Sequence, residues 1–231
     1  MCSKASSQEI VMAFSQEIPP YIIEATNSGI EIDIISAALA YKGHTLIPLY
    51  FPLGRVPIAF SNKLVDAAMG DMGTHLKDGF YANPAIIYDN IFITLKSRNI
   101  TINKPSDLDS LHVASFQGAD KRYPNWLKKV VIENRFFGVS DQLKQVKLLQ
   151  FGRSDVVLSD RYIFKYFVNK IELNSDLDIS DVDEHNFITV DPMDYRPVFR
   201  DKKVRDDFNL GLKYLKESGE FQKIYDQYLE S

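Results

Sequence analysis

Residues 152–169 read GRSDVVLSDRYIFKYFVN and contain the change from strand to helix that decides the fold. Residues 156–158 form a short apolar run, which predicts a buried strand. Residues 161–169 follow with aromatic side chains at helical spacing, which predicts a helix with one apolar face. Asp160 stands between the two, where a carboxylate often caps a helix. A strand that leads directly into a helix is the repeating unit of α/β proteins.

The same alternation continues in both directions along the chain. We predict strands over residues 10–14, 46–50, 65–69, 86–95, 111–116, 146–149, 156–158, 187–190 and 197–199. We predict helices over residues 31–41, 53–60, 124–136, 161–169, 204–216 and 221–229, with another beginning near residues 104–107. Strands that alternate with helices favour largely parallel sheets.

The composition is that of an ordinary globular protein. The chain has 231 residues, 45% of them apolar, and a formal net charge of −4. These values argue against disorder, and the mild acidity argues against a nucleic-acid partner. No apolar run approaches the ~20 residues that a transmembrane helix needs.

Cysteine and histidine usage argues against metal and cofactor chemistry. A single cysteine excludes an internal disulfide and a multi-cysteine zinc site, and the histidines are scattered without metal-ligand spacing. No phosphate-binding loop, nucleophile elbow or zinc-protease motif occurs, so we expect no cofactor. Cys2 has two interpretations: the lipid-anchored first residue of a mature lipoprotein, or a stray terminal cysteine.

Several short motifs follow one another in a specific order. They are PPY at 19–21, G-x-E-x-D at 29–33, KLVDAAM at 63–69, YANP at 81–84, SDL at 106–108 with the run 113–118, GRSDVVLSD at 152–160, and SGEF with IY at 218–225. Together, over nearly the whole chain, they resemble the family 3 bacterial extracellular solute-binding proteins, which are polar amino acid receptors of ABC importers.

The resemblance implies a fold and a mode of action. Two α/β lobes would be joined by two crossover strands, the fold of type 2 periplasmic binding proteins. Lobe one would comprise residues 1–95 plus 195–231, and lobe two residues 96–194. A monomer outside the cytoplasmic membrane would enclose a small polar ligand by hinge closure and deliver it to an ABC permease. Interdomain clefts and the carboxyl ends of parallel strands favour such sites.

The resemblance also implies ligand-binding positions, each with a structural alternative. The candidate residues are Tyr21, Arg55, Asp71, Thr74, His75, Gln117, Gly118, Ala119 and Asp160. Tyr21 would pack on the ligand or simply on its own lobe, and Asp71 would accept a hydrogen bond or cap a turn. Residues 117–119 would present N–H groups to an anion. Asp160 would hold an ammonium group or cap the following helix.

One departure from the family pattern bears on the ligand. Amino acid receptors of this family place an arginine after the strand at 65–69 to clamp the α-carboxylate, but no arginine occurs between Arg55 and Arg98. His75 or Lys77 falls near that position, and Ala119 replaces a hydroxyl residue. Arginines from other loops are the possible substitutes: Arg55 first, then Arg122, Arg161 and Arg196. The ligand is therefore an unusual amino acid, a small organic acid or another polar molecule.

Two other functions remain open. The same binding module would serve a sensor protein instead of an importer. A dehydratase of the same fold would need a carboxylic acid with a raised pKa in the cleft, a role that Asp71 or Asp160 could fill. Nothing in the sequence separates that role from ligand binding, and we expect a binding protein rather than an enzyme.

Overall fold

The computed structural model describes residues 7–69, 76, 78–174, 179–188 and 195–229. The chain folds into two compact units, of which unit 1 contains Met1–Ile87 and Asp191–Ser231 and unit 2 contains Tyr88–Val190. The first crossing, expected after residue 95, lies before β5 (Asn90–Leu95), because β5 pairs with two strands of unit 2. The return crossing, expected after residue 194, falls at residues 190–191.

Unit 1 is built on a five-stranded sheet in the order β2-β1-β3-β10-β4. Its strands are β1 (Glu9–Ser15), β2 (Thr45–Phe51), β3 (Ala67–Ala68), β4 (Phe80–Tyr81) and β10 (Val198–Phe199). The first three are parallel, whereas β10 runs antiparallel to both β3 and β4. The parallel strands therefore end at one common edge of the sheet.

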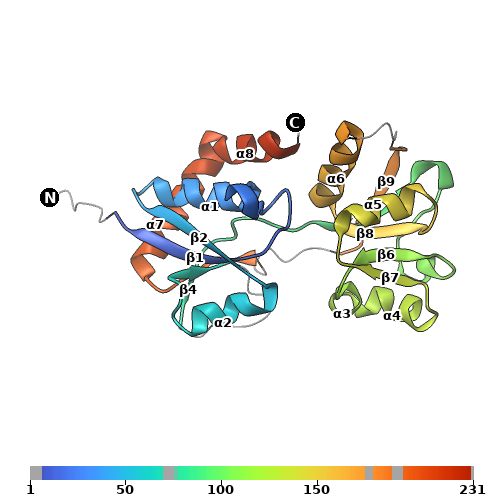
Figure 1. Ribbon diagram of the computed structural model, residues 1–231, viewed down its shortest axis with the longest axis horizontal. Coiled ribbons are helices and arrows are strands. Elements are labelled where there is room, and N and C mark those ends of the chain that lie inside the picture. The colour runs from blue at the N-terminus through green and yellow to red at the C-terminus, as the bar shows by residue number, and fades with distance from the viewer. Residues whose placement is uncertain (1–6, 70–75, 77, 175–178, 189–194, 230–231) are drawn as a thin grey trace. The chain divides into compact units, whose positions relative to one another are not determined.

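Helices cover both faces of this sheet (Figure 1). They are α1 (Ile30–Ala40), α2 (Val56–Ser61), α7 (Lys202–Ser218) and α8 (Glu220–Leu229). Figure 1 shows α1, α7 and α8 on one face and α2 on the other. Helices α1 and α7 lie so close that a Cβ atom on Gly211 would stand 1.9 Å from the carbonyl oxygen of Ala38. Only glycine fits this contact, which explains its place inside a helix.

Unit 2 repeats the same sheet arrangement in the order β7-β6-β8-β5-β9. The further strands are β6 (Val113–Phe116), β7 (Phe136–Val139), β8 (Val156–Asp160) and β9 (Val182–His185). Strands β6, β7 and β8 are parallel, and β5 is antiparallel to β8 and β9. The two sheets match position by position. Strands β1 and β6 each lie between two parallel neighbours, and the antiparallel strands β10 and β5 lie beside β3 and β8.

The helices of unit 2 also form two layers (Figure 1). They are α3 (Ala119–Arg122), α4 (Pro124–Ile132), α5 (Gln142–Gln150) and α6 (Arg161–Asn174). Helices α3 and α4 cover one face of the sheet, and α5 and α6 cover the other. The rings of Phe92, Trp126 and Phe187 meet in the core, with centroids 4.5–5.3 Å apart. Such aromatic pairs add about 0.5–1.5 kcal/mol each beyond the burial of their area.

Short 3-10 helices lie in the connections between these elements. They are η1 (Glu24–Thr26), η2 (Leu53–Arg55), η3 (Lys96–Arg98) and η4 (Pro105–Leu108). The helix expected near residues 104–107 is therefore only η4, and the helix expected over 53–60 is divided into η2 and α2. No helix in the described part of the chain is long and apolar enough to span a membrane.

Other predicted elements also differ in type or extent, among them the strands predicted over 65–69 and 86–95, of which only Ala67–Ala68 and Asn90–Leu95 are strands. The strand predicted over 146–149 is part of α5, because the Asp141 carboxylate caps a helix there by accepting the N–H of Leu143 at 3.0 Å. The helix predicted over 124–136 ends at Ile132, and Phe136 begins strand β7. In the strand predicted over 187–190, Phe187 is not in a strand and packs in the aromatic core, whereas residues 189–190 lie outside the described residues.

Candidate functional site

The carboxyl edge of the unit 2 sheet gathers most of the predicted ligand-binding residues that the structure describes. Gln117 and Gly118 follow β6, and Asp160 is the last residue of β8. Because β5 is antiparallel, its first residue, Asn90, lies directly opposite Asp160. Loops at the carboxyl ends of parallel strands are the usual binding position in α/β proteins, so this edge is the candidate site of unit 2.

The turn after β6 leads into a helix of one turn. Gly118 has φ 87°, a left-handed conformation that favours glycine, and its carbonyl accepts the N–H groups of Lys121 and Arg122. The predicted helix N-terminus is therefore present, although α3 has only four residues. Gln117 is exposed, whereas the Ala119 side chain is fully buried in the unit 2 core. The methyl group of Ala119 thus packs in the core.

Asp160 is buried, and both of its carboxylate oxygens accept backbone hydrogen bonds. Oδ1 accepts the N–H groups of Tyr162 and Ile163 at 2.9 and 3.0 Å. Oδ2 accepts the N–H of Asp89 at 2.6 Å. The first pair of bonds is a helix N-cap for α6, as the structural alternative predicts. The third bond fastens the carboxylate to the residue just before β5, so any ligand ammonium group would share an already engaged carboxylate.

Arg161 strengthens the same junction and is itself engaged by carboxylates. Its backbone N–H donates to the carbonyl of Asp89 at 3.0 Å, and its Nε donates to the Asp89 carboxylate at 3.0 Å. Its guanidinium also pairs with Glu184 and donates to Asn186. Two carboxylates already face this guanidinium, which weakens its case as a substitute clamp for a ligand carboxylate.

Arg122, Tyr123 and Asn90 also belong to this edge. Of these, only Arg122 was among the predicted residues. The hydroxyl of Tyr123, which is buried, accepts a hydrogen bond from Arg122 Nε at 3.1 Å. Burial raises the pKa of Tyr123, against hydrogen bonds with Arg122 and Asn90 that lower the pKa. Tyr123 and Asn90 were missed, although the polar pair Asp89-Asn90 inside the apolar run IIYDNIFITL was a visible signal.

Tyr21 is held within unit 1. Its side chain is fully buried, and its hydroxyl donates to the carbonyl of Ile87 at 3.5 Å. Its backbone carbonyl accepts the N–H of Glu31, in the first turn of α1. A Cβ atom on Gly29 would stand 2.3 Å from that carbonyl oxygen, so the loop and the helix touch through glycine. This burial matches the alternative in which Tyr21 packs on its own lobe.

The structure shows fewer contacts for the remaining predicted residues of unit 1. Arg55 is exposed at the end of η2, directly before α2. Arg196, another substitute for the missing arginine, stacks over the ring of Tyr81 at 4.8 Å. Asp71, Thr74 and His75 lie outside the described residues, as does Lys77. The described residues contain no group of three or more His, Cys, Asp or Glu that could hold a metal ion.

Comparisons of the sequence with family models and with curated proteins give no match. Solved structures, in contrast, match over nearly the whole chain. A histidine kinase sensor domain with similarity to periplasmic binding proteins is 17% identical, with 96% of each chain covered and a TM-score of 0.68. An ancestral cationic amino acid solute-binding protein, also described as a precursor of cyclohexadienyl dehydratase, is 17% identical, with 96% and 95% coverage and a TM-score of 0.73.

A third structure is a polar amino acid ABC uptake transporter substrate-binding protein from Streptococcus thermophilus. It is 21% identical, with 96% of this chain and 86% of that chain covered and a TM-score of 0.68. At these identities the likeness concerns the fold, and the matched proteins include both transport receptors and a sensor domain. The resemblance seen in the sequence motifs is confirmed at that level: this chain has the two-lobe α/β fold of the type 2 periplasmic binding proteins.

Proposed function

We propose that this protein is an extracytoplasmic substrate-binding protein that captures a small polar ligand between its two lobes by hinge closure and delivers it to an ABC importer. One observation carries the proposal. The two units contain sheets with the same arrangement of strands, and the chain crosses between the units twice. Each sheet directs its parallel strands toward one loop-bearing edge. Hinge closure around a ligand is an established use of this architecture.

The engaged carboxylate of Asp160 and the missing arginine bear on the ligand class. A common α-amino acid presents one ammonium and one carboxylate group, and neither finds an unengaged ionic partner among Asp160 and Arg161. We therefore expect weak binding of common α-amino acids and tighter binding of a ligand recognised mainly by hydrogen bonds. Cys2, as a lipid anchor, would keep the protein at the outer face of the cytoplasmic membrane.

The test is a ligand screen on the purified full chain. Thermal-shift measurements against the amino acids and a panel of small organic acids should give one saturable hit with 1:1 stoichiometry by calorimetry. At a concentration of 100 Kd that ligand should stabilise the protein by roughly 2.7 kcal/mol. Micromolar binding of a common α-amino acid would overturn the ligand class. Turnover of the hit, followed by chromatography, would overturn the binding function in favour of a dehydratase-type enzyme.

A second candidate function is ligand sensing for a signalling partner. The match to a histidine kinase sensor domain, which covers 96% of both chains, favours it specifically. The genes beside the coding sequence separate the two: permease and ATPase genes support import, whereas a kinase or cyclase gene supports sensing.

A further inference from the structure

The outer face of α5 in unit 2 combines positive charge with an exposed phenylalanine and a partly buried leucine. Lys144, Lys147, Leu148 and Phe151 are spaced i, i+3, i+4 and i+7, which places them on one stripe of the helix. The opposite face, with Val146 and Leu149, is buried against the sheet. Phe151 is 60% exposed and is the most exposed phenylalanine of the described residues.

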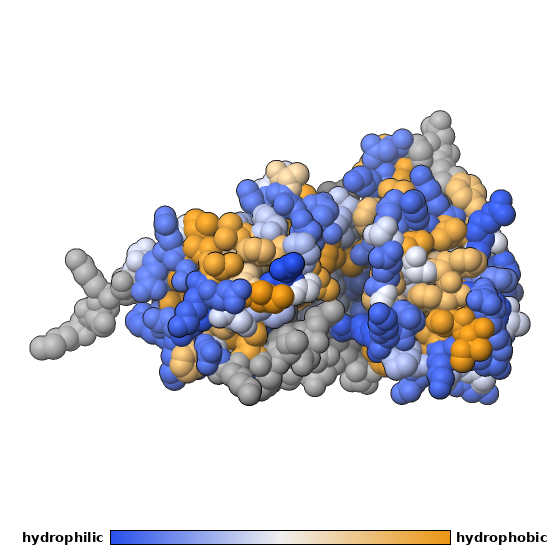
Figure 2. Space-filling model, turned by 60° about the horizontal axis from the view of Figure 1, so that its bottom comes forward, coloured by the Kyte–Doolittle hydropathy of each residue, from blue (hydrophilic) through white to orange (hydrophobic). Residues whose placement is uncertain are grey.

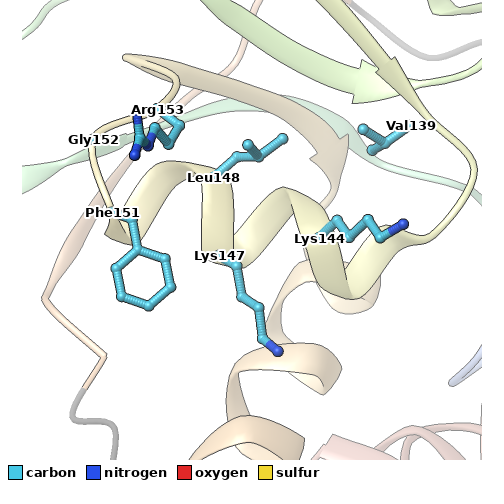
Figure 3. A pocket seen from close by; sticks show the side chains of 7 residues that line it. All are labelled: Val139, Lys144, Lys147, Leu148, Phe151, Gly152 and Arg153. Atoms are coloured by element: carbon cyan, nitrogen blue, oxygen red, sulfur yellow. The ribbon is translucent and has the colours of Figure 1, made fainter.

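The stripe borders a hollow of about 670 Å³ (Figure 3). The hollow is completed by Val139 at the end of β7 and by Gly152 and Arg153 in the turn that leads to β8. Figure 3 shows Lys147 and Phe151 leaving the helix on the same side, with Lys144 and Arg153 toward its two ends. Leu148 and Phe151 therefore lie between Arg153 toward one end and Lys144 toward the other, with Lys147 beside Leu148.

No described residue neutralises these three cations. Within the described part of the chain, Lys144, Lys147 and Arg153 make no ion pair or side-chain hydrogen bond, and no acidic residue lines the hollow. Other cations of unit 2 are paired, such as Arg98 with Asp155 and Lys129 with Asp109. Among the described residues, this surface is therefore positive on a chain whose formal net charge is −4.

We propose that the α5 surface, defined as Lys144, Lys147, Leu148, Phe151 and Arg153, docks a segment of a partner protein that carries an apolar side chain flanked by carboxylates. Carboxylates match the lysine and arginine donors, and an apolar side chain matches the hollow between them. Because the surface is concave, a protein segment fits it better than a flat lipid surface does. Lys144 and Phe151 are seven residues apart, or about 10 Å along the helix, so one helical segment is long enough to contact the whole stripe.

In the view of Figure 2, hydrophilic and apolar side chains alternate over unit 2 without one broad apolar face. That mixed surface agrees with a small, charge-guided docking site rather than an obligate subunit interface. The proposal goes beyond ligand capture. The α5 surface takes no part in binding the small ligand, so the affinity for that ligand tests the proposed function separately.

The experiment uses a fluorescein-labelled helical peptide of about 15 residues, the length at which isolated helices become marginally stable. It carries two leucines one turn apart with glutamates beyond each end, and a matched peptide has glutamine in place of glutamate. Anisotropy should show binding of the glutamate peptide to the full chain that weakens with added salt. The glutamine peptide should bind at least about tenfold more weakly.

Charge reversal at Lys144, Lys147 and Arg153 to Glu should reduce binding of the glutamate peptide at least about tenfold. Phe151→Ser should reduce it severalfold. The matched control reverses three exposed lysines elsewhere in unit 2, Lys96, Lys128 and Lys165, and should leave binding within twofold. Circular dichroism and the melting temperature check that each variant is folded.

Three results would overturn the proposal. They are failure of the glutamate peptide to bind, equal binding of the two peptides, and equal losses in the α5 and control variants. Vesicles with about a third anionic phospholipid form the remaining arm. Binding to those vesicles that is lost in the α5 variants, without peptide binding, would assign the surface to a membrane and contradict the protein-segment proposal.

Discussion

The two units share one fastening, which is less exposed and more heavily bonded in unit 2 than in unit 1. In unit 1, Asp66 precedes β3 and accepts the N–H of Val11 at 3.0 Å. In unit 2, Asp155 precedes β8 and accepts the N–H of His112 at 2.8 Å. Each aspartate also donates its own N–H to the carbonyl of the same partner residue. The amino edges of both sheets are therefore fastened in the same way.

At the carboxyl edges, the structure describes a fastening in unit 2. In unit 2, Asp160 and Arg161 hold Asp89, so the end of β8 is fastened to the start of β5. In unit 1, β3 is followed by residues 70–75, which lie outside the described residues. The comparison teaches that the fold repeats its scaffold at the amino edges, and that within the described residues the unit 2 aspartate carries an additional ion pair, between Asp155 and Arg98.

Of the substitutions that test this comparison, Asp160→Ala should have the largest effect on stability. It removes the acceptor for three backbone N–H groups in a buried position, so the free energy of unfolding of unit 2 should fall by about 2–3 kcal/mol. Urea unfolding of the full chain measures the loss. Asp160→Asn keeps one acceptor oxygen and should lose roughly half as much. A loss below about 0.5 kcal/mol for the alanine variant would show that the fastening is not structural.

The same residue is predicted to weaken the binding of a cationic ligand. Asp160→Asn removes the negative charge, and a buried ammonium group would lose its charged partner. Calorimetry with the ligand found by the screen measures the change in affinity. Unchanged affinity would remove Asp160 from the ligand site and leave it with the fastening role alone.

Asp155→Ala and Asp66→Ala compare the two shared fastenings. Asp155 accepts hydrogen bonds from His112 and from Arg98 at 2.6 Å, so its loss should cost about 1–2 kcal/mol. Asp66 is exposed and its side chain accepts the Val11 N–H, so its loss should cost about 0.5–1 kcal/mol. Hydrogen exchange of the Val11 and His112 amides localises each effect. Equal losses in urea unfolding would contradict this ordering.

The units should also respond to acid at different pH values. Burial lowers the pKa of His185 in unit 2 below its usual 6.5, so the unfolded chain binds the proton more tightly. Unit 2 should therefore lose stability as the pH falls below about 6.5. In unit 1, burial alone would raise the pKa of Asp207, but hydrogen bonds from Lys203 and His44 outweigh it and lower the pKa.

The stability due to Asp207 is therefore present above its usual pKa of 3.8 and is lost as the pH falls through the lowered value. Amide exchange measured from pH 7 to pH 3 should show opening of the β9 region before the α1–α7 contact. His185→Gln should flatten the dependence between pH 6.5 and 5, with Asp207 unaffected. Simultaneous opening of both regions in the unmodified chain would contradict the assignment.

Tyr21→Phe should have the smallest effect. The hydroxyl donates over 3.5 Å to Ile87, a weak bond, so the free energy of unfolding should fall by about 0.5 kcal/mol or less. The ring stays buried in unit 1, and the affinity for the ligand should not change if Tyr21 serves only its own lobe. A tenfold loss of affinity without a loss of stability would instead support its predicted ligand role.

Much of the fold was predictable because it rests on local signals. Apolar runs gave β1, β2, β6 and β8 their positions, and Ser218-Gly219 marked the break between α7 and α8. Failures occurred where a local signal was overlooked or where an element has no local pattern. Residues 146–149 resemble a strand in isolation, yet the Asp141 cap and the helical spacing of Val146 and Leu149 place them in α5. β4 has two residues and no pattern of its own.

The candidate site was predictable in position more than in detail. The motifs placed Asp160 and residues 117–119 at one edge of a sheet, as the structure shows. That Asp160 holds Asp89 depends on β5 returning antiparallel beside β8, and no local pattern encodes that pairing. The repeated aspartate before β3 and β8 was also missed, because KLVDAAM and GRSDVVL share little besides that residue.

Small-angle X-ray scattering of the full chain, with and without the ligand that gives the largest thermal shift, tests the central claim most directly. Capture between two lobes predicts a smaller radius of gyration and a shorter maximum dimension at saturation, because the ligand favours the closed form. Identical profiles with a ligand whose 1:1 binding has been shown by calorimetry would contradict hinge closure and, with it, the proposed function.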